Sequence, residues 1–158
     1  MAGPLNLNSL NETQCLRWVI ANLATPPANL NSLDASQCLR YMARFNLMGN
    51  TYTAPLNVQS LDSEGVLRHM IRNGFFGTGT APLNLNSLSE AQCWRWVVAT
   101  FTTFPANLNS FDSVHCIRWL IYNGFWVVGG GGSLNYLLLS DGVTQVALSD
   151  GVTLVVLP

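Results

Sequence analysis

Residues 83–101 read LNLNSLSEAQCWRWVVATF, and the same pattern occurs four more times in the chain. Aligned on the first serine of the pattern, the other copies cover residues 5–23, 28–45, 56–75 and 106–125. The anchoring serines are separated by 23, 28, 26 and 23 residues and are Ser9, Ser32, Ser60, Ser87 and Ser110. Repeats one and two resemble repeats four and five as a pair, which indicates duplication of a two-repeat unit with the third repeat between.

Each repeat opens with alternating leucine and asparagine, a period of two that predicts a short extended segment. A helix start follows. Ser9 and Glu12, and likewise Ser87 and Glu90, have the spacing of a capping box, in which each side chain bonds a free backbone N–H of the first helical turn. The other three repeats place an aspartate in the same turn, where the helix dipole favours negative charge: Asp34, Asp62 and Asp112.

About three turns of helix are predicted after each start. In repeat one, apolar residues recur at i, i+4 and i+8 from Cys15, joined by Leu16 and Ile20, so the helix has a broad apolar face. Helices this short depend on tertiary packing. The repeats are therefore expected to stack in one compact array, either open or closed. Helix ends are predicted at Gly49, Asn73-Gly74 and Asn123-Gly124, and the last two are suitable left-handed helix terminators.

The composition changes after residue 128. GGGGS at 129–133 predicts a flexible hinge. The tail, residues 134–158, contains LSDGVT twice, and its apolar β-formers with Asp-Gly turns predict three short antiparallel strands, Leu137–Leu139, Val143–Leu148 and Val152–Leu157. The predicted fold is thus mainly α: a five-repeat helical domain at 1–128, the hinge, and a small β tail with exposed edges suited to docking.

Composition narrows the function. The chain has 158 residues, 49% hydrophobic and 9% charged, with a net charge of −1. A typical soluble domain is about one quarter charged, so part of this surface is expected to be covered by other protein subunits. Near-zero net charge argues against nucleic acid as a partner. The sequence shows neither a signal peptide pattern at its start nor an apolar run of the roughly 20 residues that cross a bilayer, so neither export nor a membrane partner is expected.

Two polar sets recur with the repeat. One contains four cysteines, at a position that Val66 fills in repeat three, and we interpret them as buried free thiols: Cys15, Cys38, Cys93 and Cys116. The other contains five of the seven basic residues, all of which are arginine: Arg17, Arg40, Arg68, Arg95 and Arg118. These arginines could line a ligand groove, but packing along the helices and pairing such as that of Glu64 with Arg68 is the favoured interpretation.

The remaining aromatic, histidine and cysteine residues give little support to catalysis, metal binding or ligand binding. The stripe of Trp18, Trp96 and Trp119, shared with Tyr41 and His69, is more typical of core or subunit interface than of a ligand platform. His69 and His115 occupy different repeat positions and form no metal-ligand pattern. No nucleophile signature surrounds the cysteines. We therefore expect no enzyme activity, catalytic residue, metal, cofactor or small-molecule substrate.

The tandem YLLLSDGVTQVALSDGVTLVVLP at 136–158 resembles the leucine-rich, Asp-Gly-punctuated tail repeats of structural proteins of tailed bacteriophages. The resemblance implies a virion component, such as a capsid decoration, head–tail connector or tail-associated protein. Its location is then the virion, or the host cytoplasm during assembly.

The predicted function is structural assembly through protein–protein contacts, with copies of itself or other virion proteins as partners. The predicted interface residues are Leu137, Leu138, Leu139, Val143, Val146, Leu148, Val152, Leu154, Val156 and Trp126. A helical-repeat module that binds a peptide or soluble protein in a groove is the alternative. A third class, a small cysteine-dependent enzyme, predicts a reactive thiol of lowered pKa.

Overall fold

The computed structural model describes residues 4–23, 25–77, 80–101 and 103–126, and two short strands nearer the C-terminus. In the first four ranges each repeat contributes one 3₁₀ turn (η) and one α-helix, so the prediction of a mainly helical chain with five packed helices is confirmed. The elements are η1 (Leu7–Ser9), α1 (Glu12–Leu23), η2 (Leu30–Ser32), α2 (Ala35–Arg44), η3 (Val58–Ser60), α3 (Ser63–Arg72), η4 (Leu85–Ser87), α4 (Glu90–Ala99), η5 (Leu108–Ser110) and α5 (Ser113–Tyr122).

The leucine–asparagine segments are 3₁₀ turns, so the prediction of extended structure is wrong there. In repeat one, Leu7 N–H donates to the Pro4 carbonyl at 3.1 Å and Ser9 N–H donates to the Asn6 carbonyl at 2.9 Å. The Ser9 hydroxyl donates to the same Asn6 oxygen at 2.7 Å. A serine that bonds its own backbone three residues back favours a tight turn over a strand, and this bond recurs at every anchoring serine.

The helices begin two residues later than the predicted capping boxes, which are therefore wrong. Ser87 is engaged in its 3₁₀ turn, and α4 is capped instead by Ser89, whose hydroxyl accepts from Gln92 N–H at 3.3 Å while the Gln92 amide oxygen accepts from Ser89 N–H at 2.8 Å. Asn11 and Gln14 form the same reciprocal pair before α1. The three aspartates are the N-caps themselves: Asp34, Asp62 and Asp112.

Three helices end in a Schellman motif. After α3, Gly74 has a φ of +78° and Phe75 N–H donates back to the Met70 carbonyl at 2.9 Å. Gly124 ends α5 in the same way. After α2 this position is taken by Asn46, at a φ of +44°, so Asn46 rather than the predicted Gly49 ends the helix. A left-handed residue at this position satisfies carbonyls that the helix leaves free.

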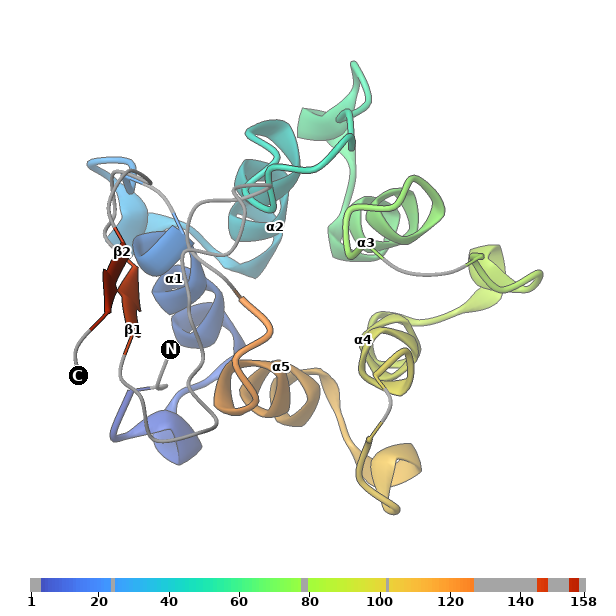
Figure 1. The fold of residues 1–158 in the computed structure, drawn as a ribbon. Helices are drawn as coiled ribbons and strands as arrows, with labels where there is room; N and C mark the ends of the chain where they lie inside the picture. Colours follow the sequence, from blue (N-terminus) through green and yellow to red (C-terminus); the bar gives the residue numbers. More distant parts are fainter. Residues whose placement is uncertain are drawn as a thin grey trace.

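The core is built from four positions of each helix. These positions, at i, i+1, i+4 and i+5 from the cysteine position, are at most 2% exposed in all five repeats, as at Cys15, Leu16, Val19 and Ile20 in α1. Burial at such a broad face requires neighbours on both sides of every helix. The α-helices therefore pack side by side, with the 3₁₀ turns outside them (Figure 1).

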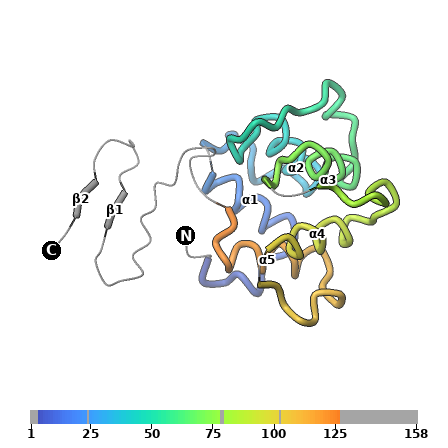
Figure 2. Tube along the Cα trace, turned by 45° about the vertical axis from the view of Figure 1, so that its right-hand side comes forward, coloured from blue at the N-terminus to red at the C-terminus, as the bar shows by residue number. Residues whose placement is uncertain are grey.

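The array closes into a ring. Each helix packs on the next along the chain, and α5 also packs on α1, so the first and last repeats are neighbours in space (Figures 1 and 2). The buried side chains of the five repeats form one core cluster, in which Trp94 of α4 and Trp126 are the largest. The structure thus selects the closed arrangement from the two that the sequence leaves open.

The described part of the tail contains β1 (Gln145–Ala147) and β2 (Leu154–Val156), an antiparallel pair in which Val146 lies opposite Val155. These strands fall within two of the three predicted strand segments. The first predicted strand, at 137–139, and the glycine hinge at 129–133 lie outside the described residues.

Candidate functional site: the seams between repeats

The repeated arginines join neighbouring repeats, and each contact between one repeat and the next around the ring is hereafter called a seam. Each one donates its Nε–H to the backbone carbonyl of the residue that follows the anchoring serine of the next repeat. The five bonds are Arg17 to Leu33 at 2.8 Å, Arg40 to Leu61 at 2.6 Å, Arg68 to Leu88 at 3.1 Å, Arg95 to Phe111 at 2.6 Å and Arg118 to Leu10 at 2.9 Å. The last bond spans the closure of the ring, because its donor is in repeat five and its acceptor in repeat one.

These bonds explain why arginine occupies this position. The accepting carbonyl is only partly exposed, and a charged donor makes a stronger hydrogen bond to it than a neutral one. In the seams made by Arg17, Arg68 and Arg118 the Nη2–H group bonds the same oxygen, which a lysine ammonium could not do with the same fork geometry. Arg68 also pairs with Glu64 at 3.0 Å, as its spacing suggests. The arginines therefore act in the packing of the repeats.

Two outer grooves lie at equivalent seams. One, of about 470 Å³, lies between α5 and η1, and the other, of about 360 Å³, lies between α2 and η3. The two grooves are lined by residues at the same positions of the repeat. In each of the following pairs the first residue lines the groove of repeat five and the second lines the groove of repeat two: Phe111 and Leu33, His115 and Gln37, Arg118 and Arg40, Trp119 and Tyr41, Tyr122 and Arg44. Each groove is closed on the far side by the 3₁₀ turn of the following repeat, through Asn8 or Gln59. The seams are thus the joints of the ring, and two of them are also hollowed on the outside.

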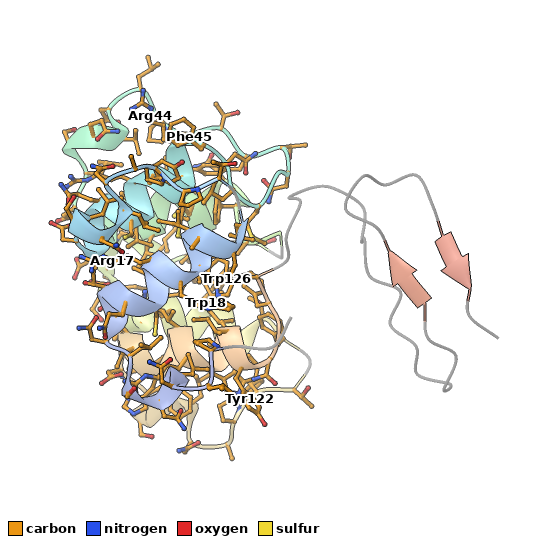
Figure 3. All side chains as sticks on the ribbon, turned by 90° about the vertical axis from the view of Figure 1, so that its left-hand side faces the viewer. Arg17, Trp18, Arg44, Phe45, Tyr122 and Trp126 are labelled. Atoms are coloured by element: carbon orange, nitrogen blue, oxygen red, sulfur yellow. The ribbon has the colours of Figure 1, made fainter. Side chains whose placement is uncertain are left out.

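The two grooves differ in their outermost side chain. Tyr122 is 79% exposed at the edge of the first groove, whereas Arg44 covers the Phe45 ring in the second, with its guanidinium carbon 5.3 Å from the ring centre. Figure 3 shows these two edges at opposite sides of the helical body. At the seam between repeats three and four, Arg72 reaches across to the Asn86 side chain. Of the two grooves, the one after repeat five has the more aromatic lining, with Phe111, Trp119 and Tyr122.

The four cysteines lie in the core. All are free and 0% exposed. Burial raises the pKa of the Cys38 and Cys93 thiols to about 11 and that of Cys116 to about 12, and it also raises the pKa of Cys15. A thiol with a raised pKa stays protonated at neutral pH, which makes it a poor nucleophile and a poor metal ligand.

The two histidines have partners other than cysteine. The His69 ring shares a 2.8 Å hydrogen bond with the Tyr52 hydroxyl, and burial together with the nearby Arg72 charge lowers the His69 pKa. His115 bonds the Asp112 cap at 2.6 Å. Within the described ranges, no three Cys, His, Asp or Glu side chains gather in a way that could hold a metal ion.

The predicted interface residues are placed as follows. Trp126 is 2% exposed and packs against Trp94, Phe76 and Phe125, so it belongs to the core of its own chain and not to an exposed surface. Only the backbone is described for Val146, Leu154 and Val156, in the two strands. The others lie outside the described residues: Leu137, Leu138, Leu139, Val143, Leu148 and Val152.

Three leucines that sequence reasoning missed are the most exposed apolar side chains in the described structure. Leu5, Leu56 and Leu83, hereafter the tip leucines, each follow the proline that opens a repeat and are essentially fully exposed. Repeats two and five have Ala28 and Ala106 at this position. The sequence does contain a signal for these residues. The same repeat position is leucine in three repeats and alanine in two, which indicates that the core does not need a large apolar side chain there.

No family model, curated protein or solved structure matches this chain. Among the described helices, none combines the length and the apolar character that a membrane span needs.

Proposed function

We propose that this protein is a structural assembly module, in which the closed ring of repeats is a rigid body that binds other protein subunits through its outer surface. The exposure of the tip leucines carries the proposal. Leucine at these positions contributes nothing to the core of the chain, because alanine occupies the same position in two repeats of the same ring. A fully exposed leucine gains roughly 1.5–3 kcal/mol when a partner buries it.

The partner we propose is a further copy of the same chain. The surface has few charges to keep copies apart, with a net charge of −1 for the whole chain, and net charge near zero favours association. Closed rings also leave no free end at which more repeats could stack, so contacts between copies must use the outside of the ring. The likeness of the tail to phage structural proteins makes a virion the assembly that we propose.

The second candidate is a module that binds an extended peptide, and the groove lined by Trp119 and Tyr122 favours it. Its aromatic walls and the Asn8 amide could hold apolar side chains and one backbone group of such a peptide. Open repeat arrays bind ligands on a concave face. In a closed ring, we propose that the ligand binds in this groove on the outer surface instead.

Solution mass by light scattering tests the main proposal. We expect the full chain to form an oligomer, and a variant with all three tip leucines changed to alanine to shift towards the monomer without loss of thermal stability. Changing Asn31 and Asn109 to alanine is the matched control, because these polar residues are also exposed and lie in the two repeats that lack a tip leucine. A monomeric full chain would contradict the proposal and favour the peptide-binding module.

A chain ending at Gly129 separates the contribution of the tail. If it keeps the oligomeric mass, the tip leucines suffice for assembly. If it becomes monomeric while the leucine variant still assembles, the tail and not the ring makes the contact, and the role given to the tip leucines is overturned.

A further inference from the structure

Two glutamates meet where the first turns of the helices converge. Glu12 is the first residue of α1 and Glu90 the first residue of α4, and both helices pack on α5 between them. The two side chains lie within hydrogen-bonding reach of each other. The first turns of α2 and α3 also meet, through a 2.7 Å hydrogen bond between the hydroxyls of Ser36 and Ser63. The N-terminal ends of the helices thus gather at one end of the ring.

The carboxyl pair lacks a donor. One oxygen of each group, Oε1 of Glu12 and Oε1 of Glu90, is buried and has no hydrogen-bond partner among the described residues. Ionised carboxylates only accept hydrogen bonds, so two of them cannot satisfy one another. Two such charges in a partly buried site also repel strongly. One proton placed between them turns one carboxyl into a donor and removes both costs.

In the part of the chain that the structure describes, no arginine donates a hydrogen bond to Glu12 or Glu90. The arginine of each of the five helices donates to a seam carbonyl instead. Besides the pair and the buried thiols, the N-caps and first six residues of the helices carry these charged or titratable groups: Arg17 on α1, Asp34 and Arg40 on α2, Asp62, Glu64 and Arg68 on α3, Arg95 on α4, and Asp112, His115 and Arg118 on α5. Repulsion from Asp112 adds to that between the two glutamates.

We propose that Glu12 and Glu90 share a single proton and form a pH-sensitive latch that holds repeats one and four together at this end of the ring. Burial, the hydrogen bond that protonated Glu12 donates to Glu90, and the nearby negative charges raise the pKa of Glu12 to about 8, so the proton is held at neutral pH. The helix N-termini favour the one negative charge that remains on the pair.

The direction of the pH effect follows from linkage. In the unfolded chain Glu12 has its ordinary pKa of 4.5, so between that pH and about pH 8 the folded ring binds one more proton than the unfolded chain. The contribution of the shared proton to the free energy of unfolding is therefore fully present below pH 4.5, and it is lost as the pH rises from 4.5 to about 8. Above pH 8 both states are ionised, and the loss levels off.

Urea unfolding at a series of pH values, with the full chain, tests the latch. From pH 6.5 to pH 8.5 we expect the folding equilibrium constant of the wild type to fall by roughly tenfold, below the ideal linkage limit because the pair is partly exposed. In Glu12→Gln the amide donates to Glu90 at every pH, so its equilibrium constant should change by less than about threefold. Glu64→Gln, which removes a carboxylate but leaves the pair, should keep the wild-type fall.

Equal pH dependence in the wild type and Glu12→Gln would overturn the proposal. Should Glu12→Gln fail to fold, a carbon-detected NMR titration of the wild-type glutamate carboxyls gives the answer without a variant. One glutamate titrating near pH 8 supports the latch. Titration of all of them between pH 3.5 and 5.5 overturns it.

Discussion

Replacing Arg118 by methionine removes the bond that closes the ring while keeping the aliphatic part of the side chain. Arg118 donates through both Nε–H and Nη2–H to the carbonyl of Leu10, about 108 residues away in sequence. A hydrogen bond from a charged donor contributes about 1.5–3 kcal/mol, and the substitution also leaves a partly buried carbonyl without a partner. We therefore expect the free energy of unfolding, measured in urea, to fall by about 2 kcal/mol.

Two companion variants make this result decisive. Arg17→Met breaks the seam between repeats one and two and should cost about as much as Arg118→Met. Arg44→Met is the control, because Arg44 is exposed and donates no hydrogen bond to a seam carbonyl, so its effect should stay within about 0.5 kcal/mol. In an open array Arg118 would have no acceptor. An Arg118→Met variant that behaves like Arg44→Met, while Arg17→Met is destabilised, would therefore refute the closed ring.

Two further predictions concern the core and the helix ends. The four cysteines should resist thiol reagents in the native protein and react fully in denaturant, because burial raises each pKa; rapid native labelling of even one would contradict the burial described here. Gly74→Ala should cost about 1–2 kcal/mol in thermal or urea unfolding because the φ of +78° is unfavourable for a residue with a Cβ, although nothing lies within 4 Å of that position. Gly74→Asn should cost less, since Asn46 adopts this conformation in the same chain; equal losses would point to a cause other than backbone conformation.

The repeat register and the helical class could be predicted from the sequence because they depend on local periodicity. The i, i+4 pattern starting at Cys15 marks the buried face of its helix without knowledge of any other repeat. The exact helix starts were predicted two residues early because Ser9 and Ser87 carry a capping spacing by chance. Their hydroxyls bond the preceding turn instead, and Asn11 and Ser89 take the cap.

Ring closure could not be predicted, because it depends on the angle between neighbouring helices summed over five steps. Arg118 has the same local sequence context as the other seam arginines, and no residue close to it in the sequence indicates that Leu10 is its acceptor. The meeting of Glu12 and Glu90 has the same origin. Glutamate occupies the first helical position only in repeats one and four, but the distance between these repeats is defined only once the ring is closed.

The exposure of the tip leucines and the burial of Trp126 could not be predicted from periodicity alone. Leu5, Leu56 and Leu83 looked like part of an alternating apolar pattern, whereas the 3₁₀ turn points them outward. Trp126 shows the opposite case, since an aromatic residue close to the glycine run was assigned to an interface and lies in the core. In both cases the backbone conformation, and not the residue type, decides whether the side chain is buried.

Paramagnetic relaxation tests the closed ring most directly. A nitroxide attached to cysteine at position 8, where the exposed Asn8 lines the same groove as Phe111 and Tyr122, should broaden the amide signals of those two residues, while the four buried native thiols stay unlabelled. Diluting chains that carry both the spin label and the isotope label in an excess of unlabelled chain suppresses broadening that arises from contacts between copies. Broadening of Phe111 and Tyr122 within one chain is the result that the structure predicts. Broadening confined to repeats one and two would contradict ring closure.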